Sequence, residues 1–200
     1  MYPLAKRLLD VLGATLLCLV LSPLLGGVAL AIWAVDGRPI LFTQLRAGHN
    51  GAPFRIFKFR TLEPGPKDPT RPFAHATRLG APLRRWAIDE LPQLWNVLRG
   101  EMSLVGPRPA PLSQVERYGT HERVRLRVRP GLTGWAQIQG RNALPWPERI
   151  EHDRWYVRHR SLWIDLRILA RTPLVLLRGT GVYGPDDRTP TFSRPSDPNA

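Results

Sequence analysis

The longest apolar run of the chain lies close to its N-terminus. Residues 11–35 form 25 consecutive positions without a formal charge. As a helix this run would measure about 38 Å, which exceeds the roughly 30 Å of a bilayer's hydrocarbon core. Ser22 and Pro23 fall near its middle, where proline kinks a helix and a serine hydroxyl can bond the carbonyl freed at Leu19. The pattern predicts a membrane helix with a central kink.

Basic residues flank this run on both sides. Lys6 and Arg7 precede it, and it is followed by Arg38, Arg46, Arg55, Lys58 and Arg60. Because positive flanks favour the cytoplasmic side, a straight span cannot satisfy both ends. A re-entrant helix and an ordinary bitopic helix with a tolerated proline both remain open on these grounds. A cleaved signal peptide is disfavoured, because the run is too long and no small-residue cleavage site leads into an acceptable mature start.

The rest of the chain predicts short strands and amphipathic helices. Strands are expected at residues 40–44 and 54–59, joined around Asn50-Gly51 as a small hairpin. A short helix or turn is expected within 79–88, and a strongly charged helix with a mostly solvated or headgroup-facing surface within 115–128. Apolar spacing predicts helices within residues 146–157 and 162–176. The last has arginines at its edges and fits either the lipid headgroup plane or a core, with a kink or an end at Pro173. The Pro-rich residues 63–72 predict a surface loop.

A short helix is also predicted immediately after an acidic pair. Leu91, Leu94 and Leu98 repeat at helical spacing, and Gly100 suits the residue beyond the helix end. Asp89 and Glu90 stand at its start, where unpaired backbone N–H groups would keep both acids ionised and would favour an incoming phosphate. Helix capping is the ordinary role of such acids. The alternative is chemical, with one acid attacking while the other binds a metal or a proton.

Composition narrows the class of partner. The 200 residues carry a formal net charge of +13, mostly from arginine, whose fork binds phosphate in pairs of hydrogen bonds. An anionic partner follows, either nucleic acid, anionic lipid or a nucleotide, although no nucleic-acid-binding motif is present. Cys18 is the only cysteine and the five histidines lack metal-site spacing, so any metal is expected to be a hard cation held by carboxylates.

Two further patterns suggest buried or ligand-facing groups. Asp153 shares a helical face with Trp146, Ile150 and Val157, so it needs a partner, and an arginine is expected. A structural ion pair and a role in a site both remain open. The Gly-punctuated residues 129–142 fit either close backbone approach to a ligand or a plain cluster of turns.

Five motifs in a fixed order resemble those of the bacterial sugar transferases known as small monotopic phosphoglycosyl transferases. One motif precedes the helix broken at Ser22-Pro23 and four follow it. The resemblance covers about Lys6 to Thr172. The motifs are Lys6-Arg7-Leu8-Leu9-Asp10, Lys58-Phe59-Arg60-Thr61, Asp89-Glu90-Leu91-Pro92-Gln93, Pro107-Arg108-Pro109 and Arg129-Pro130-Gly131-Leu132-Thr133-Gly134-Trp135. Leu62 stands where the family often has Met, and residues 63–76 do not match clearly.

The resemblance implies a mainly α fold with a small β-hairpin. It favours the re-entrant membrane helix over residues 1–36, followed by a compact cytoplasmic catalytic domain over 37–182 with interfacial amphipathic helices. Residues 183–200 are expected to form a disordered tail. The implied location is the cytoplasmic face of the bacterial inner membrane.

The implied reaction transfers a sugar-1-phosphate from a nucleotide sugar, expected to be a UDP-sugar, to undecaprenyl phosphate. It would start glycoconjugate or polysaccharide assembly by a ping-pong mechanism. The expected partners are the nucleotide sugar, undecaprenyl phosphate and membrane lipids but not nucleic acid, with a homodimer left open. The alternative is a catalytically silent membrane scaffold of a glycan assembly complex. The sugar, the base and the glycan pathway stay open.

The resemblance also assigns roles to individual residues. Asp89 would be the nucleophile that carries the phosphosugar, and Glu90 a base or a metal ligand. Mg²⁺ would be held by both acids. The substrate phosphates would be bound by Arg108, Lys58, Arg60 and Arg85. Arg141 and Gln137 would contact the nucleotide, and Asp153 would support the site.

Overall fold

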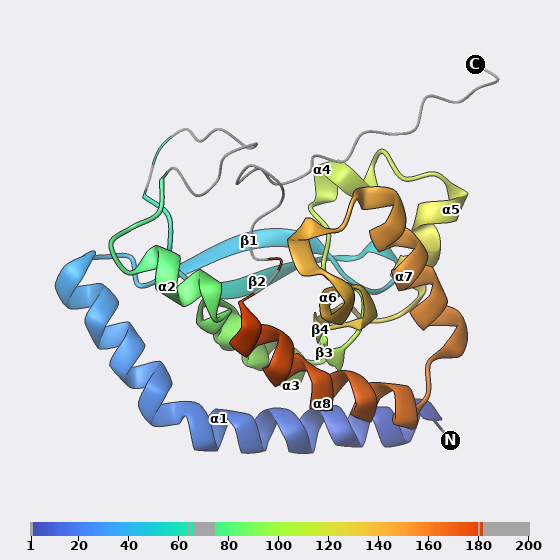
Figure 1. The fold of residues 1–200 in the computed structure, drawn as a ribbon, viewed down its shortest axis with the longest axis horizontal. Helices are drawn as coiled ribbons and strands as arrows, with labels where there is room; N and C mark the ends of the chain where they lie inside the picture. The colour runs from blue at the N-terminus through green and yellow to red at the C-terminus, as the bar shows by residue number, and fades with distance from the viewer. Residues whose placement is uncertain (1, 64, 66–74, 180, 182–200) are drawn as a thin grey trace.

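The computed structural model describes residues 2–63, 65, 75–179 and 181, and Figure 1 shows its helices arranged above one long N-terminal helix. The fold is mainly helical with a small hairpin, as predicted. Its helices are α1 (Tyr2–Val35), α2 (Gly80–Arg85), α3 (Leu94–Arg99), α4 (Leu112–Val115), α5 (Thr120–Arg123), α6 (Trp135–Gln139), α7 (Trp146–His159) and α8 (Leu162–Arg178). Its strands are β1 (Leu41–Ala47), β2 (Pro53–Phe59), β3 (Ser103–Val105) and β4 (Gly131–Thr133). Single 3-10 turns are η1 (His49–Gly51), η2 (Ile88–Gln93), η3 (Val124–Arg127) and η4 (Arg141–Ala143). The predicted tail and most of the Pro-rich loop lie outside the described residues.

Helix α1 runs without interruption through Pro23 and bends in its middle (Figure 1). The Ser22 hydroxyl donates to the Leu19 carbonyl at 2.8 Å, which is the bond expected from the sequence. Leu4, Leu8, Leu12 and Leu16 repeat every fourth residue, and all four are exposed. Within the part of the chain described, α1 is the one helix long and apolar enough to cross a membrane.

The N-terminal half of α1 is tied to the rest of the fold by polar contacts. Arg7 donates to the carbonyls of Val97 at 2.7 Å and Leu98 at 2.9 Å, so it caps the C-terminal end of α3. The buried Asp10 carboxylate accepts from the Ser103 hydroxyl and the Leu104 N–H, both at 2.9 Å. This half of the helix is therefore part of the folded core.

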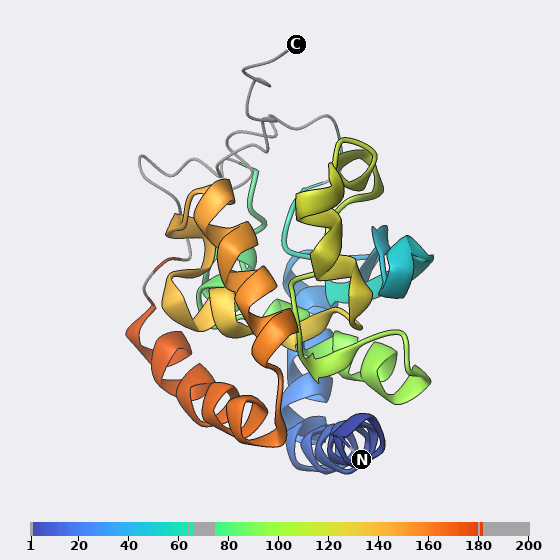
Figure 2. The same cartoon turned by 90° about the vertical axis from the view of Figure 1, so that its right-hand side faces the viewer.

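Arg60 connects the C-terminal end of α1 to the same domain. Its guanidinium donates to the carbonyls of Gly37 at 2.9 Å and Pro39 at 2.7 Å, and also to that of Asp36. Nearby, Ile32 of α1 belongs to an apolar cluster with Phe59 and Leu83. Both halves of the apolar helix thus contact one compact domain, which lies along one side of α1 in Figure 2.

The predicted hairpin is present, with Leu41 opposite Phe59 and Ala47 opposite Pro53. Its connection places Asn50 at φ 55° and Gly51 at φ 81°, the left-handed region that these residue types adopt readily.

A second pairing was not predicted from the sequence. Strands β3 and β4 are parallel, with Ser103 opposite Gly131 and Val105 opposite Thr133. Each has three residues, too few to show a period-two pattern. A Cβ at Gly131 would lie 2.0 Å from the Gly106 nitrogen, so this glycine allows two backbone segments to meet. It thus serves backbone packing beside β3.

The main core lies between α1, α3, the β3–β4 pair and the two C-terminal helices. Its members include Leu94, Val97, Met102, Leu104, Val105, Tyr156 and Ile168. The Tyr156 hydroxyl donates to Asp165 at 2.7 Å, and the Tyr2 hydroxyl donates to the other oxygen of the same carboxylate at 3.0 Å. Helices α1, α7 and α8 are therefore joined at one buried acid.

One helix prediction is wrong, and at a second helix the structure excludes one of two outcomes that were left open. The expected helix at 115–128 is divided into the short α4, α5 and η3, because the chain is extended at Gly119 with φ −77° and ψ −175°. Arg125, expected on a solvated face, is 2% exposed. The predicted helix at 162–176 does form, and it continues through Pro173 to Arg178. Its exposed apolar residues are Trp163, Leu166, Leu174 and Leu177.

We expect Gly131→Ala to destabilise the fold by about 3 kcal/mol or more, because the new methyl group would overlap backbone atoms that cannot rotate away. Gly26→Ala is the matched control, since a Cβ there has no heavy atom within 4 Å. Alanine in a helix interior should leave stability unchanged or raise it by about 0.5–1 kcal/mol. Denaturant unfolding in detergent measures both, and equal stability of the two variants would contradict the packing role.

Candidate active site

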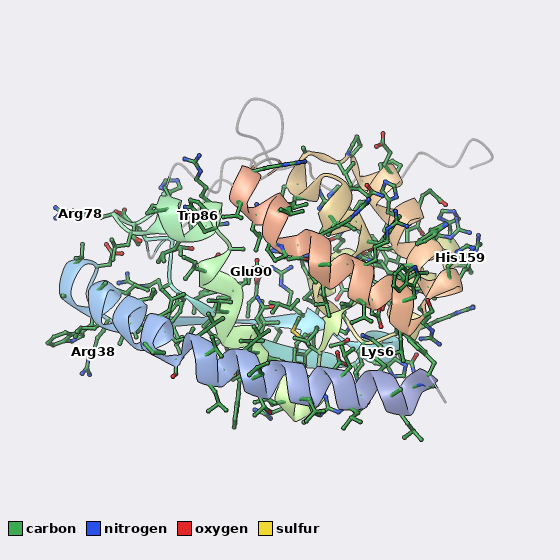
Figure 3. The ribbon with its side chains drawn as sticks, turned by 60° about the horizontal axis from the view of Figure 1, so that its bottom comes forward. Lys6, Arg38, Arg78, Trp86, Glu90 and His159 are labelled. Atoms are coloured by element: carbon green, nitrogen blue, oxygen red, sulfur yellow. The ribbon has the colours of Figure 1, made fainter. Side chains whose placement is uncertain are left out.

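A cavity of about 610 Å³ lies between α1, η2, α6 and α8. One wall is apolar and consists of α1 and α8 residues, among them Leu16, Leu17, Leu21, Leu169 and Leu176. The lining also includes the charged side chains of Lys58, Arg84, Asp89, Glu90, Arg108, Arg141, Arg149 and Asp153. Figure 3 shows Glu90 in the interior of the molecule, between the green helical segment and α8.

The acidic pair does not cap a helix as predicted. Asp89 and Glu90 lie in the first turn of η2, and the residue before it, Ala87, is left-handed at φ 56° without a side-chain cap. Among the described residues, no backbone N–H donates to either carboxylate. The chain enters α3 through a 3-10 turn, and this geometry places both acids on the wall of the cavity.

Glu90 is held by two cations. Lys58 Nζ donates to Oε1 at 2.6 Å, while Arg108 donates Nη1 to Oε2 at 2.8 Å and Nη2 to Oε1. Burial alone would raise the pKa of the Glu90 carboxyl, but Arg108 and Lys58 hold it well below its usual range. Burial lowers the pKa of Lys58, and Glu90 opposes that change. This cluster is thus a buried anion with two fixed cations.

Asp89 has the opposite environment. It is 6% exposed, and no hydrogen bond or ion pair joins it to another residue of the described chain. Burial and the neighbouring Glu90 charge raise the pKa of Asp89, and Lys58, Arg84 and Arg108 offset part of that rise. The two acids, both expected to stay ionised, therefore have different surroundings. Two carboxyl groups whose pKa values are pushed apart suit two different roles.

The turn that carries Arg108 is held at every carbonyl. Pro107 accepts from the Gly131 N–H at 2.9 Å, and Arg108 accepts from the Arg125 guanidinium at 2.9 Å. Pro109 accepts from Arg46 at 3.4 Å, and Ala110 from the Ala47 N–H at 2.9 Å. Two flanking prolines also restrict the backbone. The guanidinium of Arg108 therefore extends from a rigid base.

Asp153 has the arginine partner that was predicted. Arg125 Nη2 lies 2.7 Å from its carboxylate, and both side chains are almost fully buried. Because Arg125 also donates to the Arg108 carbonyl, Asp153 supports the site indirectly. Asp153 lines the cavity as well, so the ion pair and the role in the site are both compatible with the structure.

The structure brings only some of the other predicted residues to the cavity. Arg141 and Gln137 line it. Arg85 does not, and its neighbour Arg84 lies there instead and donates to the Thr61 hydroxyl at 3.2 Å. Arg60, predicted to bind phosphate, donates to the carbonyls after α1 and lies outside the cavity lining. Its guanidinium fork suits converging backbone carbonyls as well as phosphate.

Three arginines were missed. Arg84 differs from Arg85 only in helical phase, and Arg125 sits in a stretch that resembles a solvated helix. Arg149 precedes Asp153 by four residues on the same helix face, and that spacing could have identified it.

The expected Mg²⁺ site is incomplete in this arrangement. No group of three or more His, Cys, Asp or Glu side chains comes together within the described ranges. Both Glu90 oxygens accept hydrogen bonds from cations, so Glu90 fits poorly as a metal ligand. Asp89 alone offers carboxylate oxygens without a partner. The pair is thus not a ready-made metal centre.

The comparison with known families decides the classification. The model of the family described as bacterial sugar transferase matches residues 1–179. The chain belongs to the bacterial sugar transferase family. The resemblance found from the five ordered motifs is therefore confirmed.

Relatives within this family have similar sequences. An uncharacterized sugar transferase of Bacillus subtilis, EpsL, is 42% identical over 180 residues, which cover 88% of this chain and 89% of the relative. The UDP-glucose:undecaprenyl-phosphate glucose-1-phosphate transferase of Caulobacter vibrioides is 45% identical, covering 90% of this chain and 72% of the relative. The undecaprenyl-phosphate glucose phosphotransferase of Komagataeibacter xylinus is also 45% identical, covering 84% of this chain but 35% of the longer relative.

We expect Asp89→Asn to raise the melting temperature at pH 7.5. A carboxyl whose pKa is raised by folding binds its proton more tightly in the folded state, so wild-type stability falls as the pH rises above about 4. Asparagine does not titrate, and the difference between the two proteins should shrink as the pH is lowered toward 4. Thermal unfolding between pH 4 and 8 measures this.

Glu90→Gln is the matched control for Asp89→Asn. Its melting temperature should fall at pH 7.5, because Lys58 and Arg108 would lose their shared counter-charge. A loss of stability in Asp89→Asn as large as in Glu90→Gln would contradict the different environments assigned to the two acids.

Proposed function

We propose that this protein transfers a sugar-1-phosphate from a UDP-sugar to undecaprenyl phosphate. The observation that carries the proposal is the unpaired Asp89 carboxylate beside the Lys58–Glu90–Arg108 cluster, in a cavity that is also lined by leucines of α1 and α8. A charged wall suits a diphosphate, and an apolar wall suits a polyprenyl chain. The name of the Caulobacter relative supports both substrates, and that of the Komagataeibacter relative supports undecaprenyl phosphate.

In the first step, an Asp89 oxygen attacks the phosphorus that carries the sugar. The new bond joins aspartyl oxygen to phosphorus, and the bond from that phosphorus to the bridging oxygen of the diphosphate breaks. The electron pair leaves with the nucleoside monophosphate. Burial leaves the Asp89 carboxylate poorly solvated, which favours attack, while Arg108 and Lys58 offset charge on the transferred phosphate.

In the second step, an oxygen of undecaprenyl phosphate attacks the same phosphorus. The aspartyl oxygen–phosphorus bond breaks, Asp89 is restored as a carboxylate, and the product is a lipid diphosphate sugar. Two displacements replace one encounter of three bulky groups, and they predict ping-pong kinetics.

Glu90 is best assigned to positioning. A carboxyl whose pKa lies well below its usual range is a weak base near neutral pH. Its two oxygens hold Lys58 and Arg108 at fixed places, and this supports a role in orienting the cations. Of the two roles left open by the sequence, neither proton removal nor metal binding suits it well.

We further propose that Mg²⁺ accompanies the diphosphate and is not resident in the protein. Mg²⁺ retains several water ligands and is commonly held by one or two carboxylates together with substrate phosphates. When bound, it would offset negative charge on the leaving phosphate. Asp89 is the one acid of the pair with oxygens free of protein donors.

We also propose the re-entrant topology at the cytoplasmic face of the inner membrane. Arg7 and Asp10 join the first half of α1 to the domain, while Arg60 and Ile32 join its second half. A straight span would place these two regions on opposite sides of the bilayer. The bend at Ser22-Pro23 lets both contact one domain. A homodimer stays a prediction.

Transfer can be tested with purified protein, undecaprenyl phosphate and a panel of UDP-sugars labelled in the sugar. We expect UMP release and label in the lipid fraction, and loss of both by several powers of ten in Asp89→Asn. Without the lipid, a phosphosugar adduct on Asp89 should be detected by mass spectrometry. No UMP with any donor would favour the silent scaffold, and full activity of Asp89→Asn would refute the assigned nucleophile.

Removal of divalent metal gives a separate prediction. Treatment with EDTA should abolish UMP release, and added Mg²⁺ should restore it. The melting temperature without substrate should stay unchanged, because the described residues form no metal centre of three or more acidic, His or Cys groups. A large fall in melting temperature would instead reveal a resident metal.

A further inference from the structure

Arg149 is a buried cation that neither the predicted site nor the proposed mechanism uses. It is 6% exposed and lines the cavity. Its Nη2 donates to the Leu144 carbonyl at 3.0 Å, and its guanidinium lies 4.5 Å from the Trp146 ring centroid. Its Nε is buried without a hydrogen-bond partner among the described residues. No carboxylate of the described residues forms an ion pair with Arg149.

Several features of this position disfavour a positive charge. Arg149 lies in the first turn of α7, where the helix dipole favours anions. Burial, Arg108 and Arg125 together lower the pKa of Arg149 to about 10, so it remains charged at neutral pH at a cost. Asp153 offsets part of that cost, but its own ion pair is with Arg125. A bound anion from outside the protein would supply the counter-charge that Arg149 lacks.

The whole cavity has a surplus of the same sign. Its lining contains five cationic side chains, Lys58, Arg84, Arg108, Arg141 and Arg149, and three acids, Asp89, Glu90 and Asp153. Lys58 and Arg108 share Glu90, whereas Arg141 and Arg149 belong to other elements of the lining, η4 and α7, and neither is bonded to Glu90. Several cations around one cavity suit a ligand with more than one phosphate group.

We propose that Arg149 binds a phosphate group of the substrates at a second subsite, distinct from the Lys58–Glu90–Arg108 cluster. This deepens the proposed function and rests on it. The nucleoside-linked phosphate of the donor is the expected occupant, because the sugar-linked phosphate must face Asp89 and Arg108. Arg141 lines the same cavity and would contact the same nucleotide.

The test uses the full chain in detergent and measures UMP binding by calorimetry, which needs no turnover. Arg149→Gln should weaken UMP binding by about ten- to one-hundred-fold, as expected for lost charge-assisted hydrogen bonds. Arg149→Met keeps the apolar stem against Trp146 and serves as the reference for folding. Without ligand, the melting temperature of Arg149→Gln should fall by no more than that of Arg149→Met. Arg158→Gln, on an exposed position of the same helix, is the matched control and should bind UMP like wild type.

A second measurement distinguishes the two sources of phosphate. KM is determined for the UDP-sugar and for undecaprenyl phosphate in wild type and both Arg149 variants. A rise for the UDP-sugar assigns the subsite to the nucleotide, and a rise for the lipid alone assigns it to the lipid phosphate. Unchanged UMP binding and unchanged KM values in both variants would overturn the subsite. If wild type neither binds nor releases UMP, the proposed function itself fails.

Discussion

The site depends on one buried carboxylate shared by two cations. Without Glu90, Lys58 of β2 and Arg108 of the proline-flanked turn would be two like charges in a poorly hydrated cavity. Arg108 would then turn away, and Lys58 would turn away or lose its proton. With Glu90 between them, both stay charged and point into the same space. Such a buried network contributes little net stability. Its value is geometric, because it holds phosphate donors in place before a substrate arrives.

Asp89 shows how strongly surroundings outweigh residue type. It is adjacent to Glu90 in sequence and equally buried, yet its carboxylate has no partner among the described residues. The cavity therefore contains a carboxylate without a partner, Asp89, and an arginine without an ion pair of its own, Arg149. A nucleotide diphosphate would supply a negative charge beside Arg149 and would place a phosphorus atom near Asp89. The charges of the cavity are thus incompletely balanced without substrate, and substrate binding would make their electrostatic energy more favourable.

The features that could be predicted from the sequence are those that depend on local residue patterns or on the ordered motifs. The kinked α1, the hairpin, α7, α8 and the arginine partner of Asp153 follow from periodicity and from the cost of burying an acid. The β3–β4 pair could not be predicted, because two three-residue strands carry no pattern and meet only through Gly131. The position of Arg60 outside the cavity and that of Arg84 in its lining could not be predicted for a related reason. Whether an arginine contacts carbonyls or a cavity depends on tertiary contacts that charge and spacing do not encode.

The polar contacts of α1 link opposite ends of the chain, and this has a consequence for biogenesis. Asp10 bonds residues more than ninety positions away, and Tyr2 bonds Asp165 at a separation of 163 residues. Contacts this distant form late, because long loops must close first. During synthesis the apolar helix would leave the ribosome well before its partners in β3 and α8. The membrane would therefore shelter α1 first, and the domain would assemble on a helix already in place.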